Sequence, residues 1–275
     1  MNAALDNRFK SLEMLAIRLK PRGMTNYFRS LAEAFFGSLC SLITLRLYGN
    51  VEAPLLTKIL EQHGSRLREL ALIAFNYDKN ARICTVSEIL EICNSCPQLE
   101  RLSLRIKRTK SNWLETQHYE ALGTFASLVG LSLDLDCRTP YQSTHPTVDE
   151  FSDALINRAV DETLARSIYD IITSNKPGRP LAYLRLTSCS TYLLHSSGLI
   201  LDKRTSNMSR RFLLRRNERD DSDDIEVTEI GKRSREHLDE LYRSRDAEIK
   251  NRAGHEEMIR NAFEKLWPSK FKDRD

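Results

Sequence analysis

Two short stretches of the sequence contain residue types that bind metal ions or catalyse hydrolysis. Cys93-x-x-Cys96 has the spacing of half a zinc site, but no second pair of Cys or His residues lies at a suitable distance. His255-Glu256-Glu257 lacks the second histidine of a zinc protease motif, and the sequence has neither a Gly-x-Ser-x-Gly elbow nor a glycine-rich phosphate loop. We therefore predict a protein that is not an enzyme and that holds no metal ion or cofactor.

A basic stretch at 203–219 has the residue types that contact nucleic-acid phosphates. Its cationic residues are Lys203, Arg204, Arg210, Arg211, Arg215, Arg216 and Arg219. Acidic residues follow at once in 220–224, so in a hairpin the charges would partly neutralise one another across the strands. The net charge of +4 for the whole chain adds little attraction for a polyanion. A self-paired hairpin is therefore favoured over a nucleic-acid site.

Cysteine usage and the absence of long apolar runs indicate where the protein resides. The six cysteines are spread over 275 residues, whereas disulfide scaffolds are dense in short secreted chains. No apolar run approaches the roughly 18 to 20 residues of a membrane helix. Charged residues interrupt residues 1–20, so this segment lacks the continuous apolar region of a secretory signal. We expect an intracellular protein of the cytoplasm or nucleus that has no membrane partner.

The most regular pattern in the chain is a Leu-x-x-Leu-x-Leu core with six copies, one of which ends in Ile. The copies begin at Leu12, Leu42, Leu67, Leu99, Leu128 and Leu181. In a strand, the last two apolar positions of each core point to one face, and the residues between and beside them point to the other. Helix-like sequence separates the copies. The pattern predicts an α/β leucine-rich repeat solenoid of short parallel strands and outer helices.

Local signals place the starts of several helices. Thr85 followed by Glu88 has the pattern of a capping box, and Asn112 followed by Glu115 repeats that spacing. Pro54 suits the first turn of a helix, where its missing N–H costs nothing. We expect helices to begin at these three points.

The spacing of the copies defines the predicted domains. Successive copies start 25 to 32 positions apart, except the last two, which are 53 apart. We expect an insertion at 137–148 and a long helix over 149–175 in that interval, within a solenoid that spans 1–190. Alternating apolar and polar residues predict a hairpin-containing cap at 191–230. The region 231–275 is predicted to be a charged helical tail that ends in an amphipathic helix.

Residues that flank the strand leucines are expected on the concave face, where solenoids usually bind. Alignment of the copies gives three columns of side chains across that face. Tyr and Arg combine a large contact area with directional hydrogen bonds, so the columns predict a protein-binding surface. The predicted partner-binding residues are Arg46, Tyr48, Arg101, Arg105, Asp134, Tyr183 and Arg185.

Several motifs resemble a known family. With its repeats, its Cys96-Pro97-x-Leu99 junction and the tail motifs Arg211-Phe212-Leu213-Leu214 and Phe263-x-x-Leu266-Trp267-Pro268, the chain resembles the repeat region of fungal F-box/leucine-rich-repeat proteins. The resemblance implies a substrate receptor of a cullin-RING ubiquitin ligase, in which the F-box docks the ligase adaptor and the repeats hold the substrate. The sequence departs from that pattern because no F-box is visible before Leu12, where eleven residues cannot hold a domain of about 40 to 50 residues.

The sequence therefore predicts a non-enzymatic protein–protein interaction scaffold that binds a partner on the concave face. A role as a ubiquitin ligase substrate receptor follows from the resemblance. The first alternative is a stand-alone repeat scaffold or inhibitor without a ubiquitin link. The second and weaker alternative is nucleic-acid binding through 203–219.

Overall fold

The computed structural model describes residues 11–19, 26–74, 82–110, 112–137, 156–174, 176–189, 210–217, 224–234 and 236–237. The predicted insertion from residue 138 onward and the predicted helical tail beyond residue 237 lie outside these residues. So do residues 203–209 and 218–219 of the basic stretch.

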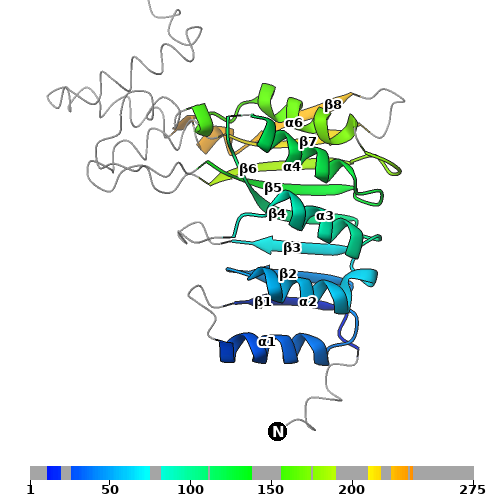
Figure 1. Cartoon of the computed structure of the whole chain (residues 1–275). Coiled ribbons are helices and arrows are strands. Elements are labelled where there is room, and N and C mark those ends of the chain that lie inside the picture. Colours follow the sequence, from blue (N-terminus) through cyan, green and yellow to red (C-terminus); the bar gives the residue numbers. More distant parts are fainter. Residues whose placement is uncertain are drawn as a thin grey trace, which may run out of the picture.

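Eight strands in the described chain form one sheet, whose order in space follows their order in the sequence (Figure 1). Six of them pair in parallel: β1 (Met14–Arg18), β2 (Thr44–Tyr48), β3 (Glu69–Ile73), β4 (Arg101–Lys107), β5 (Gly130–Asp136) and β6 (Tyr183–Cys189). Two antiparallel strands, β7 (Arg211–Arg216) and β8 (Ile225–Ile230), continue the sheet beyond β6. The fold is thus mixed α/β with a mostly parallel sheet.

Helices connect the parallel strands and pack side by side along one face of the sheet (Figure 1). They are α1 (Asn26–Ser38), α2 (Ala53–His63), α3 (Val86–Ser95), α4 (Trp113–Gly123) and α6 (Glu162–Ser174), with a 3-10 turn (Gly64–Arg66) after α2. Parallel neighbours need such a crossover, because the chain must return to the starting end of the sheet before each new strand. The face of the sheet opposite these helices is called the open face below.

The leucine pattern decides which side of each strand meets the helices. In β4, Leu102 and Leu104 are 1% and 2% exposed, while Arg101 on the other side is exposed. From β2 to β6, the last two apolar residues of every core are at most 6% exposed. In β1 at the edge of the sheet, Leu15 and Ile17 are only partly buried. All six predicted cores form strands at the expected positions.

The predicted helix starts are confirmed. At α3, the Thr85 hydroxyl accepts a hydrogen bond from the Glu88 N–H at 3.3 Å, and the Glu88 carboxylate accepts one from the Thr85 N–H at 2.9 Å. At α4, the Asn112 side-chain oxygen accepts from the Glu115 N–H at 3.1 Å. Pro54 lies in the first turn of α2. These caps satisfy backbone donors that have no partner inside the helix.

The helix predicted over 149–175 is not continuous in its described part. A helical turn at 156–158 is followed by an isolated bridge residue, Val160, and α6 begins only at Glu162. The Asp161 carboxylate accepts from the Leu164 N–H at 2.8 Å, and the Val160 carbonyl accepts from the Arg210 N–H at 3.3 Å. Asp161 therefore caps a new helix, and the backbone before it bonds to the segment leading into β7.

The predicted hairpin is confirmed by the antiparallel pairing of β7 with β8. Phe212 and Leu214 of β7 are 2% and 0% exposed and join the same core as the strand leucines. The hairpin thus continues the sheet and its core instead of forming a separate layer. Among the described helices, none combines the length and the apolar character that crossing a bilayer requires.

Candidate functional site

Strand pairing arranges the predicted site residues in rows across the open face. Directly paired residues of neighbouring strands project to the same side of the sheet. Two rows cross from β1 to β6: Met14, Thr44, Glu69, Arg101, Gly130 and Tyr183 in the first, and Ala16, Arg46, Ala71, Ser103, Ser132 and Arg185 in the second. The register expected for both columns is confirmed.

The third expected column is divided. Arg18, Tyr48 and Ile73 pair across β1 to β3, and Arg105, Asp134 and Thr187 pair across β4 to β6. The pairing of β3 with β4 ends at Ala71 and Ser103, so the two halves are not joined by strand pairing.

A hollow of about 370 Å³, the central hollow, opens on this face over β2, β3 and β4. Its lining combines charged, aromatic and small side chains: Arg46, Tyr48, Glu69, Ala71, Ile73, Arg101, Leu102, Ser103 and Tyr183. Four of the seven predicted partner-binding residues line it, namely Arg46, Tyr48, Arg101 and Tyr183. Residues up to 137 positions apart in the sequence therefore share one depression.

Glu69 organises the two arginines of the central hollow. One carboxylate oxygen accepts from the Arg46 Nε at 2.6 Å, and the other accepts from an Arg101 terminal nitrogen at 3.2 Å. The hydrogen bond and charge of Glu69 raise the pKa of the Arg46 guanidinium. Arg46 bonds to Glu69 through its Nε, and a hydrogen bond with Tyr48 also raises the pKa of its guanidinium. The Arg46 and Arg101 side chains are still 46% and 59% exposed, so a bound group with acceptor oxygens can reach both guanidinium groups.

The structure places Arg105 differently from the expectation that it faces a partner. Its side chain is 2% exposed, and its Nε donates to the Asp134 carboxylate at 2.5 Å. Asp134 also accepts from the Thr187 hydroxyl at 3.4 Å. Arg105 is buried because this carboxylate, on the neighbouring strand and the same side of the sheet, neutralises it. Arg105 and Asp134 thus form an internal ion pair outside the central hollow.

Several open-face residues, Glu69 among them, were not among the predicted site residues. Glu69 belongs to the first column of the aligned copies. Its place on the strand between Arg46 and Arg101 was the sequence signal that could have identified it as a site residue. Arg215 pairs directly with Tyr183, and Leu213 pairs with Arg185, so β7 extends both rows. Arg211 shares the side of Leu213 because strand residues alternate. The basic stretch therefore contributes to the same face as the repeats, which hydrophobic periodicity alone did not show.

A buried charged cluster lies near the start of α4. Glu115 is 0% exposed and accepts at 2.6 Å from Arg108, from the Tyr119 hydroxyl and from the Thr109 N–H. Burial, followed by the charge of Glu115, raises the pKa of Tyr119 well above its usual value. The carboxylate is fully enclosed by these donors, so the cluster has a structural role.

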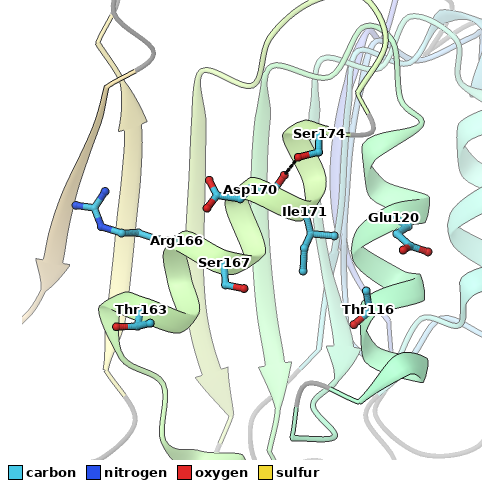
Figure 2. Close-up of a pocket in the computed structure, with 8 residues that line it drawn as sticks. All are labelled: Thr116, Glu120, Thr163, Arg166, Ser167, Asp170, Ile171 and Ser174. Carbon is cyan, nitrogen blue, oxygen red and sulfur yellow. Dashed lines mark hydrogen bonds between the residues drawn. The ribbon is translucent and has the colours of Figure 1, made fainter.

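A second hollow, of about 560 Å³, lies between α4 and α6 on the helical side (Figure 2). Figure 2 shows Ile171 pointing from α6 toward α4, where Thr116 and Glu120 lie. Ser174 donates to the Asp170 carbonyl at 2.7 Å, and Arg166 bonds to Glu162 on its own helix at 2.9 Å. These contacts are local to α6, and none of them pairs a hydroxyl with a base across the hollow.

The thiols of the Cys93-x-x-Cys96 pair lie in different surroundings. Cys96 ends α3 and is 1% exposed, and burial raises the pKa of its thiol to about 12. Cys93 is partly exposed and accepts a contact from the Thr124 hydroxyl at 3.5 Å. In the described part of the chain, no three His, Cys, Asp or Glu side chains converge as metal ligands would.

Comparison of the chain with protein-family models, with curated proteins and with solved structures finds no match. The function is therefore inferred from the open face itself.

Proposed function

We propose that this chain is a non-enzymatic scaffold that binds another protein on its open face. The central hollow carries this proposal, because two tyrosines and two arginines from three different strands line one depression of about 370 Å³. Tyr and Arg dominate the binding energy of many protein interfaces, since each offers a large contact area and directional donors.

The proposal includes a leucine-rich repeat architecture. Six copies of one sequence core form six successive parallel strands, and a helical segment leads from each strand to the next. The helices cover one face of the sheet, which leaves the rows of the other face as the surface on which a partner would lie (Figure 1).

A narrower form of the proposal gives the chain the role of a substrate receptor for a cullin-RING ubiquitin ligase, in the cytoplasm or nucleus. Its support is the resemblance of the repeats and tail motifs to fungal F-box/leucine-rich-repeat proteins. A stand-alone repeat scaffold or inhibitor uses the same open face without the ligase. Recovery of the ligase adaptor with the chain distinguishes the two.

Site-specific photocrosslinking tests the broader proposal. A photoreactive amino acid at Tyr48 lies in the central hollow, and one at Trp113, which is 67% exposed on α4, provides a control on the helical side. We expect the Tyr48 probe to crosslink a defined protein in cells and the Trp113 probe to give none of that product. Equal crosslinking from both positions, or no product from Tyr48, contradicts binding on the open face.

Affinity capture of the tagged chain from a fungal lysate tests the ligase role. Co-purification of the cullin-RING adaptor supports the substrate receptor. If the protein crosslinked from Tyr48 is captured without adaptor or cullin, the chain is a scaffold and the ubiquitin role is excluded.

A further inference from the structure

The hairpin changes the charge of the open face. Arg215 and Leu213 pair with Tyr183 and Arg185, while the alternate residues Phe212 and Leu214 are buried in the core. Arg211, Leu213 and Arg215 therefore project on the same side as the two rows. On β8, Glu226 pairs with Arg215 and reaches this side as well.

Counted over β1 to β8, the open face has an excess of arginine. Two pairs neutralise themselves: Arg105 with Asp134, and Lys107 with Asp136 at 3.5 Å. Apart from these pairs, the charged residues of the face are six exposed arginines and two glutamates: Arg18, Arg46, Arg101, Arg185, Arg211, Arg215, Glu69 and Glu226. This excess of four positive charges equals the formal net charge of the whole chain, which is +4. The strands of the open face therefore give a net positive charge to the surface that carries the central hollow.

Several of these guanidinium groups have capacity for a ligand. Arg185, Arg211 and Arg215 are exposed and form no ion pair among the described residues. Arg46 and Arg101 each use one nitrogen for Glu69, and their side chains are 46% and 59% exposed. A planar guanidinium binds a carboxylate through two parallel hydrogen bonds, which a lysine does not.

We propose, building on the proposed function, that the partner segment held by the open face is an acidic polypeptide whose carboxylates pair with these arginines. The three arginines Arg46, Arg101 and Arg185 lie on β2, β4 and β6. Each is therefore separated from the next by two strand spacings, or about 10 Å across the sheet. A chain in the polyproline II conformation advances about 3.1 Å per residue with three residues per turn, so acidic side chains three residues apart lie on one side and meet successive arginines. An apolar side chain between them enters the central hollow against Tyr48, Ile73 and Tyr183.

The lining of the hollow favours a polypeptide over a nucleic acid. Glu69 lies between Arg46 and Arg101 and repels a continuous phosphate backbone, whereas a peptide places a carboxylate at each arginine and neutral groups opposite Glu69. Ala71, Ile73 and Leu102 add apolar surface that accepts a side chain rather than a phosphate.

Fluorescence anisotropy on the full chain tests the proposal with defined probes. The probes are a labelled 12-residue peptide of four Glu-Leu-Ser repeats, the same peptide with Lys in place of Glu, and a labelled single-stranded RNA of 12 nucleotides. We expect the Glu peptide to bind more weakly as salt is raised, and the Lys peptide not to bind. Arg101→Glu combined with Arg185→Glu is expected to weaken Glu-peptide binding at least tenfold. Arg166→Glu, an exposed arginine of α6, is the matched control and leaves it unchanged.

The proposal is overturned if the Lys peptide binds or if the Glu peptide does not bind. It is also overturned if Arg166→Glu weakens Glu-peptide binding as much as the open-face variant does. Tighter binding of the RNA than of the Glu peptide, abolished by the open-face variants, also overturns it and assigns the face to nucleic acid. Thermal melting of each variant separates lost binding from unfolding, and Arg185→Gln, which removes one charge without reversing it, is expected to give a smaller loss. If the Tyr48 crosslink persists while the Glu peptide does not bind, the open-face site stands and the acidic partner class is excluded.

Discussion

The aromatic ring of Tyr183 lies directly against the backbone of Gly130 on the neighbouring strand. A Cβ atom built on Gly130 would come within 2.4 Å of the Tyr183 Cζ and hydroxyl oxygen, closer than non-bonded atoms approach. Glycine at this position therefore lets the ring lie across β5 and reach the central hollow over β4. Gly130 thus positions Tyr183 for a partner, although it has no side chain of its own.

Replacement of Gly130 by Ala is expected to weaken partner binding while changing stability little. The atoms that collide belong to the free end of the Tyr183 side chain, so the ring swings away at a cost of about 1 kcal/mol or less. Tyr183→Ala is expected to lose the same binding, and the double variant no more than either change alone. Ser132→Ala, on the same strand and face, is the control. Additive losses of crosslinking yield from Tyr48 would contradict this coupling.

Leu102→Ala tests the core register. Leu102 is 1% exposed and packs in the continuous core, so its truncation is expected to cost about 2 to 5 kcal/mol in the free energy of unfolding. Ser103→Ala, one residue along and on the open face, is expected to be near neutral. Urea denaturation measures both. A change in Leu102→Ala too small to resolve would show that this side of β4 is not the buried one.

The strand positions and two rows of the open face follow from the sequence because they depend on short-range rules. Alternation in a strand places Leu102 and Leu104 on one side and Arg101 and Ser103 on the other, and repetition of the core aligns each strand with the next. Helix caps such as Thr85 are equally local. These features needed no knowledge of distant contacts.

Features that depend on tertiary contacts could not be predicted in the same way. The burial of Arg105 requires Asp134 on the next strand, and the break before α6 depends on Asp161 together with the segment that leads into β7. Helical periodicity continues through residue 160 and so gave no sign of that break. The position of Arg215 beside Tyr183 depends on the register of β7 with β6, which no pattern within 203–219 specifies.

Glu115→Ala tests the buried charged cluster. Removing the carboxylate deprives Arg108, which is 4% exposed, of the Glu115 oxygen that it contacts at 2.6 Å in a buried site. The loss of one member of a buried pair typically costs about 3 to 5 kcal/mol, so we expect a loss of that size in the free energy of unfolding. Glu120→Ala, an exposed carboxylate on the same helix, is expected to change stability by less than about 0.5 kcal/mol. If chemical denaturation shows equal changes in the free energy of unfolding for Glu115→Ala and Glu120→Ala, Glu115 is exposed to solvent.

Protonation of His63 is expected to destabilise the fold below about pH 6.5. The ring is 0% exposed; its Nδ1 accepts from the Leu42 N–H at 3.4 Å, and its Nε2 lies 3.2 Å from the Phe36 carbonyl, to which it donates. In the neutral imidazole, one ring nitrogen thus accepts a hydrogen bond and the other donates one. A proton on Nδ1 would point at the Leu42 N–H, so this hydrogen bond would be lost and two donors would face each other.

Burial lowers the pKa of His63 below the 6.5 of an unfolded chain, so the unfolded state takes up the proton first as the pH falls. The contribution of His63 to stability is therefore complete above pH 6.5 and is lost progressively as the pH falls through the folded-state pKa. Melting temperatures measured from pH 7.5 to 5.0 are expected to fall more steeply for the unmodified chain than for His63→Gln. His118→Gln, a change on α4 where Nδ1 contacts only a carbonyl of its own helix, is expected to keep the steep profile. Parallel profiles for the unmodified chain and His63→Gln would mean that other groups cause the acid sensitivity.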